Sequence, residues 1–308
     1  MPPRVSVGLP VFNGENYISQ AIRSILGQDF RDFELIIADN ASTDRTPAIC
    51  AEFAHCDPRV RYVRNDRNRG AAWNLNRVVE LATGSYFKLC AHDDKVSPNY
   101  LSECVRALEG DGRAVLAYGT TRIIDQNGIE LPIDPGGLPD VSARSPVQRF
   151  KIALRHGGAM HEMHGVFRLD ALRRGGLHRA YYGSDRAMLA EIALFGTFVR
   201  APSAIFYCRE HPDRSSKPID KSQRASFMAG DSPAKAPAEH WALLRHLLEI
   251  TRLHREIAPA WRTLAVVLLW SLTPLQLARY TSEALERISP AAQKKLRAFV
   301  WQLLAFRR

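Results

Sequence analysis

The chain has 308 residues, of which 46% are hydrophobic and 24% are charged. This length and composition permit a sizeable core and exclude an intrinsically disordered chain. The net charge of +10 favours an anionic partner such as a nucleotide, a nucleic acid or an acidic lipid surface, and does not choose among them.

The cysteines and the N-terminus suggest a reducing compartment. The spacing of the five cysteines matches no zinc or disulfide framework, so we expect buried thiols in a cytoplasmic protein. The N-terminal MPPRVSVGLPVF lacks the apolar segment of a signal peptide and leads into a strand.

The first ninety residues alternate between strand and helix patterns. Short apolar runs predict strands at 5–12, 33–40, 60–64 and 86–90. Helical spacing of apolar residues predicts helices at 16–26, from 42–44 onward, and at 74–81. This alternation predicts an α/β fold whose mostly parallel sheet is flanked by helices.

Polar clusters follow three of these strands, at Asn13–Glu15, Asp39–Asn40 and His92–Asp94. Taken singly, they are compatible with a turn, a helix cap and a solvated loop. Because ligands of such sheets bind beyond the carboxyl ends of the strands, the three together predict a binding crevice.

Several motifs in order carry a resemblance to a known family. LPVFNGENY, LIIADNASTD, NRGAAWNLN with LATGSYFKLCAHDD, and GSDRAMLAEIALFG resemble the family-2 nucleotide-sugar glycosyltransferases, which are inverting enzymes of GT-A fold. The resemblance covers about residues 4–216. It implies a GT-A catalytic domain at 1–216, and the composition beyond it predicts a linker at 217–240 and a helical C-terminal region at 241–308.

The resemblance implies a site for a nucleotide-diphosphate sugar. Base and ribose would contact the segment that begins at Pro10, and Asp39 would hydrogen-bond to the base. Gly70 would permit close backbone approach to the nucleotide, and Arg69 is either a phosphate ligand or a solvated side chain. The implied nucleotide-binding residues are Pro10, Val11, Phe12, Asn13, Glu15, Asp39, Asn68, Gly70, Asn76, His92 and Asp93.

The acidic pair Asp93 and Asp94 matches the family's metal motif, for Mn²⁺ or Mg²⁺. Family members often read Asp-Xaa-Asp-Asp, whereas Ala91 stands at the first acid here. Which aspartate binds the metal is therefore left open, and His92 is either a further ligand or a contact to ribose or phosphate. His211 is expected to help hold the metal, and Arg209 and His211 to close over the diphosphate.

An inverting transfer needs a general base, and the resemblance assigns this role to Asp185. Its position before Met188, Leu189 and Ile192 also fits a helix cap. His161 and His164 fall in the family's acceptor region. With Glu162 they form a cluster that lacks the His-Glu-Xaa-Xaa-His spacing of a zinc site, so we expect acceptor contacts there.

The C-terminal region is predicted to be helical, and two interpretations of it stay open. Its uncharged run of 16 residues, 263–278, is too short for a membrane span and contains Pro274. The helices either lie on an acidic membrane surface, with Trp261, Trp270 and Trp301 at the interface, or pack on the catalytic domain or a sister subunit in a homo-oligomer.

The resemblance implies a metal-dependent inverting glycosyltransferase with a saccharide or lipid-linked saccharide acceptor, acting in cell-surface polysaccharide or glycolipid synthesis. It would be cytoplasmic or peripheral on the inner face of the cell membrane. The alternative is a non-catalytic nucleotide-sugar-binding or membrane-assembly module. No Gly-Xaa-Gly-Xaa-Xaa-Gly follows the first strand, which argues against a dehydrogenase, and scattered basic residues argue against nucleic-acid binding.

Overall fold

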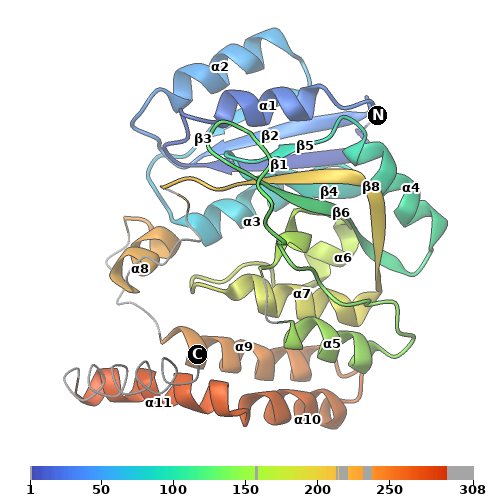
Figure 1. Ribbon diagram of the computed structural model, residues 1–308, viewed down its shortest axis with the longest axis vertical. Coiled ribbons are helices and arrows are strands. Elements are labelled where there is room, and N and C mark those ends of the chain that lie inside the picture. The colour runs from blue at the N-terminus through green and yellow to red at the C-terminus, as the bar shows by residue number, and fades with distance from the viewer. Residues whose placement is uncertain (1, 157–158, 213, 215–220, 232–237, 290–308) are drawn as a thin grey trace. The chain divides into compact units, whose positions relative to one another are not determined.

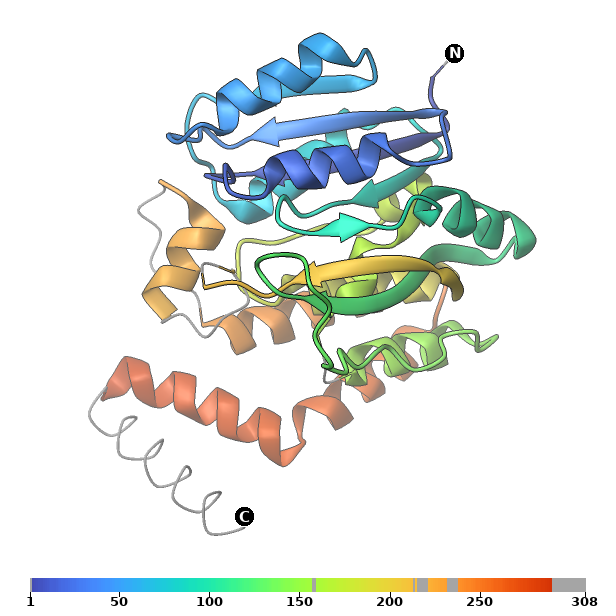
Figure 2. The same ribbon diagram turned by 45° about the horizontal axis from the view of Figure 1, so that its top comes forward.

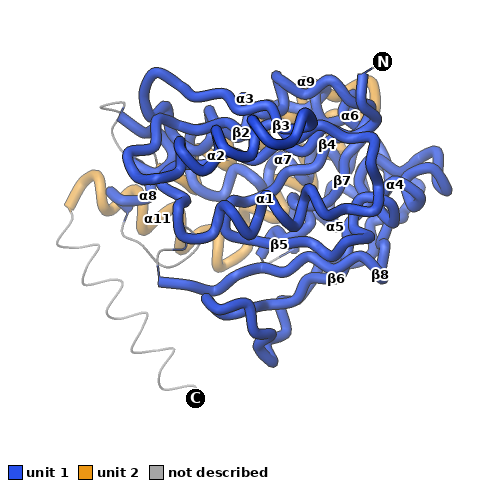
Figure 3. The backbone as a smooth tube through the Cα atoms, turned by 90° about the horizontal axis from the view of Figure 1, so that it is seen from above, with its two compact units in different colours: residues 1–236 blue, residues 237–308 orange. Residues whose placement is uncertain are grey.

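The computed structural model describes residues 2–156, 159–212, 214, 221–231 and 238–289. The chain divides into two compact units, Met1–Ala236 and Pro237–Arg308, which are coloured separately in Figure 3. Each unit is described by itself below.

The first unit begins with the predicted alternation of strands and helices (Figure 1). Strand β1 is buried along its length, and Ile18, Ala21, Ile22 and Ile25 of α1 turn one helical face into the core. The elements are β1 (Val5–Val11), α1 (Ile18–Leu26), β2 (Phe33–Asp39), α2 (Thr46–Cys56), β3 (Val60–Arg64), α3 (Ala71–Leu81) and β4 (Tyr86–Leu89).

The rest of the first unit extends this sheet. Its elements are β5 (Lys95–Val96), α4 (Tyr100–Gly110), β6 (Ala114–Ile124), α5 (Pro146–Arg155), the short 3₁₀ helix η1 (His161–His164), β7 (Val166–Arg168), α6 (Leu169–Arg174), α7 (Ser184–Phe195) and β8 (Thr197–Arg209). The strand order is β3-β2-β1-β4-β7-β6-β8-β5. Only β7 and β5 run antiparallel to their neighbours, so the sheet is mostly parallel, as predicted.

Helices cover both faces of the sheet (Figures 1 and 2). Val5, Val7 and Leu9 of β1 share one core with residues of α1 and α4. Gly8 faces the other way, where a Cβ would lie 2.7 Å from Val78 of α3. This arrangement follows from right-handed crossovers that run in opposite directions on the two sides of β1.

The strand pairing of the sheet also determines which segment lies beside the acidic pair, Asp93 and Asp94. In the register of β5 with β8, Lys95 lies opposite Tyr207 and Val96 opposite Phe206. The residues just before Lys95 therefore meet the end of β8. A segment 115 residues further along the chain is thereby brought to the acidic pair.

The segment predicted as a mobile linker contains a helix, α8 (Lys221–Ala229). In the second unit, the described part of the predicted helical region forms α9 (Glu239–Leu253), α10 (Ala260–Ser271) and α11 (Pro274–Ile288). The remainder of that region, 290–308 with Trp301, lies outside the described residues. Of the helices that are described, none combines the length and apolar character that crossing a membrane requires.

Candidate functional site

The centre of the site is a pairing of Asp93 with His211. Nε2 of His211 lies 2.9 Å from Oδ2 of Asp93, and the Asp93 side chain keeps 14% of its exposure. The imidazole packs on the Tyr17 ring at a centroid distance of 4.8 Å. Its other nitrogen, Nδ1, is buried without a hydrogen-bond partner among the described residues. The pair therefore joins the end of β4 to the end of β8.

Asp94 occupies a different environment from its neighbour. It is buried, and its Oδ1 accepts a hydrogen bond of 2.8 Å from the backbone N–H of Arg209. Burial and the adjacent charge of Asp93 raise the pKa of Asp94. Burial also raises the pKa of Asp93, but the hydrogen bond with His211 and the charges of His92 and His211 outweigh it, so its pKa is lowered. Within the pair, Asp94 therefore holds a proton more readily than Asp93 does.

Arg209 is fully buried and its guanidinium is already engaged. It donates to the backbone carbonyls of Asp93, Asp125 and Gln126 and to Oε1 of Gln20. It also stacks over the Tyr17 ring at 4.7 Å. The resemblance implied a diphosphate contact for Arg209; in the structure its contacts make it a clamp that fixes the acidic loop.

The loops after β1 and β2 are tied to each other. Asn13 adopts a left-handed conformation with φ of 52°, and its Oδ1 accepts a hydrogen bond from the Thr43 backbone. Oε2 of Glu15 accepts one from the Arg45 backbone in the same way. Asn13 and Glu15, which were expected to contact the base and ribose, thus hold the loop after β2 in place.

Asp39 is completely buried at the end of β2. Its Oδ1 accepts from the Ser42 backbone at 2.8 Å, and its Oδ2 from the Tyr62 hydroxyl at 2.7 Å. Arg64 adds an ion pair at 3.3 Å. Both carboxylate oxygens are therefore occupied by the protein, and Asp39 organises the loop beside the expected base site.

The loop 68–70 lies under α8. Gly70 has φ of 85°, and a Cβ there would collide with the backbone carbonyl of Met228. Asn68 exchanges two hydrogen bonds with Asp231, one of 2.9 Å through its carbonyl and one of 3.1 Å through its N–H. In the structure, the backbone that closely approaches Gly70 is that of the C-terminal end of α8.

The side chain of Asn76 makes its hydrogen bonds to the backbone of the segment before α7. Its Nδ2 donates to the His178 carbonyl at 2.8 Å and its Oδ1 accepts from the His178 N–H at 3.0 Å. Asn76 therefore anchors the segment before α7.

His92 lies against the loop after β1. A Cβ on Gly14 would lie 2.6 Å from Cδ2 of His92, so a glycine there lets the imidazole pack on the backbone. Of the remaining predicted contacts, Val11 is buried, Pro10 is partly exposed and Phe12 is exposed. Phe12, Asn13 and Glu15 are thus exposed at this corner, and His92 is partly exposed.

The acceptor-region histidines lie beside Phe206 of β8, which lines the same cavity as Asp94. The His164 ring stacks on Phe206 of β8 with centroids 4.8 Å apart, and its Nδ1 is another buried nitrogen without a partner among the described residues. Burial and the charge of Lys88 lower the pKa of His164 to about 3, against an opposing effect of Asp93. His161, whose ring lies 6.2 Å from Phe206, has its pKa lowered by burial to about 4. Both imidazoles are therefore neutral.

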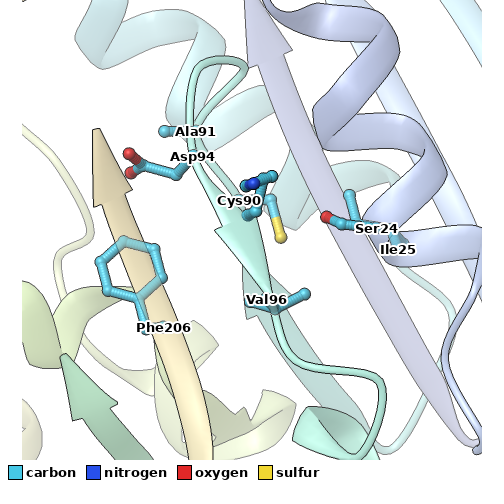
Figure 4. A pocket seen from close by; sticks show the side chains of 8 residues that line it. Ser24, Ile25, Cys90, Ala91, Asp94, Val96 and Phe206 are labelled. Carbon is cyan, nitrogen blue, oxygen red and sulfur yellow. The ribbon is translucent and has the colours of Figure 1, made fainter. Parts of the chain in front are cut away.

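A small cavity of about 10 Å³ lies behind the acidic loop, lined by Cys90, Asp94 and Phe206 among others (Figure 4). The Asp94 carboxylate points towards β8, drawn in yellow, which carries Phe206. This volume holds no more than one water molecule.

Asp185 lies in the first turn of α7, after Gly183 in the left-handed conformation with φ of 87°. Its Oδ1 accepts the N–H of Arg186 at 2.9 Å, so the carboxylate caps the helix. Burial raises its pKa above the ordinary value. A carboxylate with a raised pKa at a helix start is compatible with both the cap and the base interpretation.

Several residues at the site were not predicted. Tyr17 supports both His211 and Arg209, and Tyr62 binds Asp39. Lys88, discussed below, lies inside the strand that precedes the acidic pair. A lysine inside an otherwise apolar run was the available signal for Lys88, whereas nothing local marks either tyrosine.

The side chains near Asp93 could supply part of the ligand set of a divalent cation. Among the described residues, no group of three or more His, Cys, Asp or Glu side chains gathers as a metal site. Asp93 and His211 supply two adjacent donor atoms. Mg²⁺ and similar ions are commonly held by one or two carboxylates together with substrate phosphates and water. The two side chains fit such a site and do not fit a closed structural site.

Comparisons with known proteins agree with this architecture. The model of the glycosyl transferase family 2 matches residues 6–171, more than half of the chain. EpsE of Bacillus subtilis is 37% identical over 108 residues, which are 35% of this chain and 39% of EpsE. The chondroitin synthase of Escherichia coli is 33% identical over 126 residues, 41% of this chain and 18% of the synthase. The matches therefore span less than half of these relatives.

Two solved structures share the fold. Staphylococcus aureus TarS 1–349, in complex with UDP-GlcNAc, has a TM-score of 0.61 at 15% identity, covering 91% of this chain and 73% of TarS. The mannosyltransferase PcManGT of Pyrobaculum calidifontis, in complex with GDP-Man and Mn²⁺, has a TM-score of 0.52 at 20% identity, with coverages of 94% and 88%. The first unit thus has the GT-A fold.

The chain belongs to the glycosyl transferase family 2. This confirms the resemblance predicted from the motifs, and the mostly parallel sheet flanked by helices confirms the fold class.

Proposed function

We propose that the protein transfers a sugar from a nucleotide-diphosphate sugar to a hydroxyl acceptor. The observation that carries this proposal is the Asp93–His211 pair, at 2.9 Å, in the crevice of a family-2 glycosyltransferase fold. Relatives and structural neighbours support the substrate class, since one is named a chondroitin synthase and others contain UDP-GlcNAc or GDP-Man. Synthesis of a cell-surface polysaccharide or glycolipid is the setting that we infer.

We propose Asp93 and His211 as the ligands of a Mn²⁺ or Mg²⁺ ion. Neighbouring ligands of an octahedral ion at about 2.1 Å lie about 3.0 Å apart, so the distance between Oδ2 and Nε2 suits one shared ion. A bound ion would neutralise the negative charge of the diphosphate leaving group. Asp94, buried and bonded to the Arg209 backbone, would hold the loop in shape. PcManGT supports the metal, since its structure contains Mn²⁺.

Asp185 is the proposed general base of an inverting displacement. Its raised pKa gives a stronger base than an ordinary carboxylate, and the base removes the acceptor proton as the hydroxyl attacks the anomeric carbon. An α-linked donor would then yield a β-linked product. Asp185 keeps its capping bond to Arg186 through one oxygen, Oδ1.

The acceptor would lie beside His164 and His161. Their lowered pKa values keep both rings uncharged at neutral pH, and Nδ1 of His164 lacks a partner among the described residues. A neutral imidazole with a free nitrogen suits a sugar hydroxyl. We infer a saccharide, free or lipid-linked, as the acceptor.

A thermal-shift experiment tests donor class and metal together. UDP and GDP are offered with and without Mn²⁺, and at least one should raise the melting temperature more strongly when Mn²⁺ is present. Stabilisation by neither nucleotide under either condition would overturn the proposal.

Donor hydrolysis then separates an enzyme from a binding module of the same fold. Wild-type protein should hydrolyse or transfer the sugar of the bound donor, and Asp185→Asn should lose this activity while keeping the nucleotide-induced melting shift. Nucleotide binding without turnover in the wild type would support the binding module instead.

We further propose that the second unit attaches the protein to anionic lipid. In α10, Thr263, Val267 and Trp270 are buried, so the predicted interfacial place of Trp270 is wrong, whereas Trp261 is 68% exposed. Exposed leucines accompany Trp261, and the only charged residue from Pro259 to Ala278 is Arg262, which stacks over Trp261 at 5.0 Å. An apolar face with tryptophan and arginine suits a bilayer surface. The exposed leucines of this stretch are Leu264, Leu268, Leu269, Leu272, Leu275 and Leu277.

Co-sedimentation with vesicles tests this attachment. Binding should be stronger to vesicles containing phosphatidylglycerol than to pure phosphatidylcholine, and Leu268→Glu should weaken it. Ile129→Glu, at an exposed position of the first unit, is the matched control and should bind as wild type does. A dimer in light scattering with no vesicle binding would assign the face to a sister subunit.

A further inference from the structure

A buried lysine lies in the strand that carries the acidic pair. Lys88 of β4 is 1% exposed and sits in register between Val7 of β1 and Val166 of β7. No carboxylate of the described residues lies within ion-pair distance of its ammonium. Burying an unpaired ammonium costs several kcal/mol as an order of magnitude, so such a group calls for an explanation.

The ammonium is held by a backbone carbonyl and two aromatic rings. Nζ donates to the carbonyl oxygen of His164, which also accepts the Tyr100 hydroxyl at 3.3 Å. It lies 4.2 Å from the centre of the Tyr100 ring and 5.8 Å from that of Phe206. These cation–π contacts partly replace the lost hydration. Lys88 thereby joins β4 to the last residue of η1.

The ring of His164 packs on β8. Its stacking partner Phe206 lines the same small cavity as Asp94, the neighbour of Asp93. Asp93 follows Lys88 by five residues on the same strand and loop. One side chain therefore links the strand that delivers the acidic pair to the residue that presents the free imidazole nitrogen.

We propose that Lys88 is a positioning residue for acceptor use, which holds the η1 turn and its His164 imidazole at a set distance from Asp93. This inference rests on the proposed function, because it assigns η1 to the acceptor. Lys88 does not touch the reacting atoms. It acts through the backbone of His164.

A second buried cation shows what a purely structural role looks like. Arg149 of α5 donates to the carbonyls of Ala143, Arg144, Ala193 and Leu194, which joins α5 to the end of α7. These four carbonyls satisfy the N–H groups of the Arg149 guanidinium. Lys88 makes one strong hydrogen bond, and Tyr100 would still donate to the His164 carbonyl if the ammonium were removed. An apolar side chain of similar length should therefore be tolerated by the core at position 88.

The test compares Lys88→Met with Arg149→Met. Acceptors are a panel of nitrophenyl hexosides, and donors are UDP-hexoses and GDP-mannose, chosen by activity with the wild type. Lys88→Met should keep the wild-type melting temperature within a few degrees and the Mn²⁺-dependent nucleotide shift, while the acceptor KM rises about tenfold. Arg149→Met should lower the melting temperature and leave the acceptor KM unchanged.

Hydrogen exchange provides a readout that needs no acceptor. Lys88→Met should speed exchange of the Met163 and Gly165 amides, which bond to Met160 and Glu162 within the turn. Exchange in α3 should not change. Wild-type exchange in η1 together with a wild-type acceptor KM would overturn the positioning role, and so would an equal loss of donor and acceptor affinity.

A second variant keeps the proposal testable if Lys88→Met does not fold. Tyr100→Phe removes the other donor to the His164 carbonyl and should raise the acceptor KM by a smaller factor, about threefold. An unchanged acceptor KM and unchanged η1 exchange in Tyr100→Phe would contradict the proposal. If the wild type neither binds nucleotide nor transfers sugar, the proposed function fails, while the exchange data still decide whether Lys88 holds η1.

Discussion

The two sides of the crevice satisfy their polar groups differently. On the donor side, Asn13, Glu15 and Asp39 are bonded to backbone groups or neighbouring side chains. On the reaction side, His211 and His164 each keep a buried ring nitrogen without a partner among the described residues. Unsatisfied buried groups are costly, so they mark where a ligand completes the site, while the satisfied side provides a rigid wall.

The comparison of the two sides predicts that substituting Asp93 has the largest effect on activity. Asp93→Asn should lower kcat/KM about 10²- to 10³-fold, because several kcal/mol of charge stabilisation are lost and about 1.4 kcal/mol corresponds to tenfold. Steady-state kinetics with the preferred donor measure this, with Asp66→Asn, an exposed residue paired to Arg69, as the control. Loss of activity in both variants, or in neither, would remove Asp93 from the proposed metal site.

The pH profile should show a base that titrates above an ordinary carboxylate. Burial raises the pKa of Asp185, and only the deprotonated form accepts a proton. As pH falls through this raised pKa, which lies above the ordinary aspartate value of 3.8, kcat should decrease about tenfold per pH unit. The kcat profile of the wild type is compared with that of Asp185→Asn, whose residual rate should not follow this limb. An unchanged limb in the variant would assign the titration to another group.

On the donor side, Asp39→Asn should act mainly on stability. The amide cannot accept the hydrogen bonds of Ser42 and Tyr62 as well as ionised Asp39 does, so the free energy of unfolding should fall by about 1–3 kcal/mol. Urea unfolding, followed by a spectroscopic signal from the first unit, measures this fall in the free energy of unfolding. Asp57→Asn, which removes a partly exposed carboxylate paired with Arg59, should cost less. A larger loss of stability in Asp57→Asn than in Asp39→Asn would contradict the interpretation that the polar groups of the donor side are already hydrogen-bonded within the protein.

The smallest effect is expected at the neutral imidazole. His164→Phe keeps the stacking on Phe206 and removes the free nitrogen, so the acceptor KM should rise about tenfold, the equivalent of one neutral hydrogen bond and no less than in Lys88→Met. Donor KM should stay at its wild-type value in the same assays. A selective rise in donor KM would move His164 to the donor side of the comparison.

Much of the framework could be predicted because it depends on local patterns. Apolar runs and helical spacing located β1 to β4 and α1 to α3 within a few residues, and Asp39 and Asp93 at strand ends followed from them. The expectation of a mobile linker at 217–240 missed α8, whose end packs on the loop 68–70. Polar composition alone does not reveal a helix that is stabilised by such a tertiary contact.

The sequence by itself determined the fold class, the family and the set of acidic and imidazole candidates. Only the tertiary structure decided that Asp93 faces His211, that Asp94 binds the Arg209 backbone, and that Arg209 is a buried clamp. Asp93 and His211 are 118 residues apart, and the antiparallel pairing of β5 with β8 brings them to 2.9 Å. A periodic pattern encodes which face of an element is buried, whereas the partner across the crevice depends on how distant elements pack.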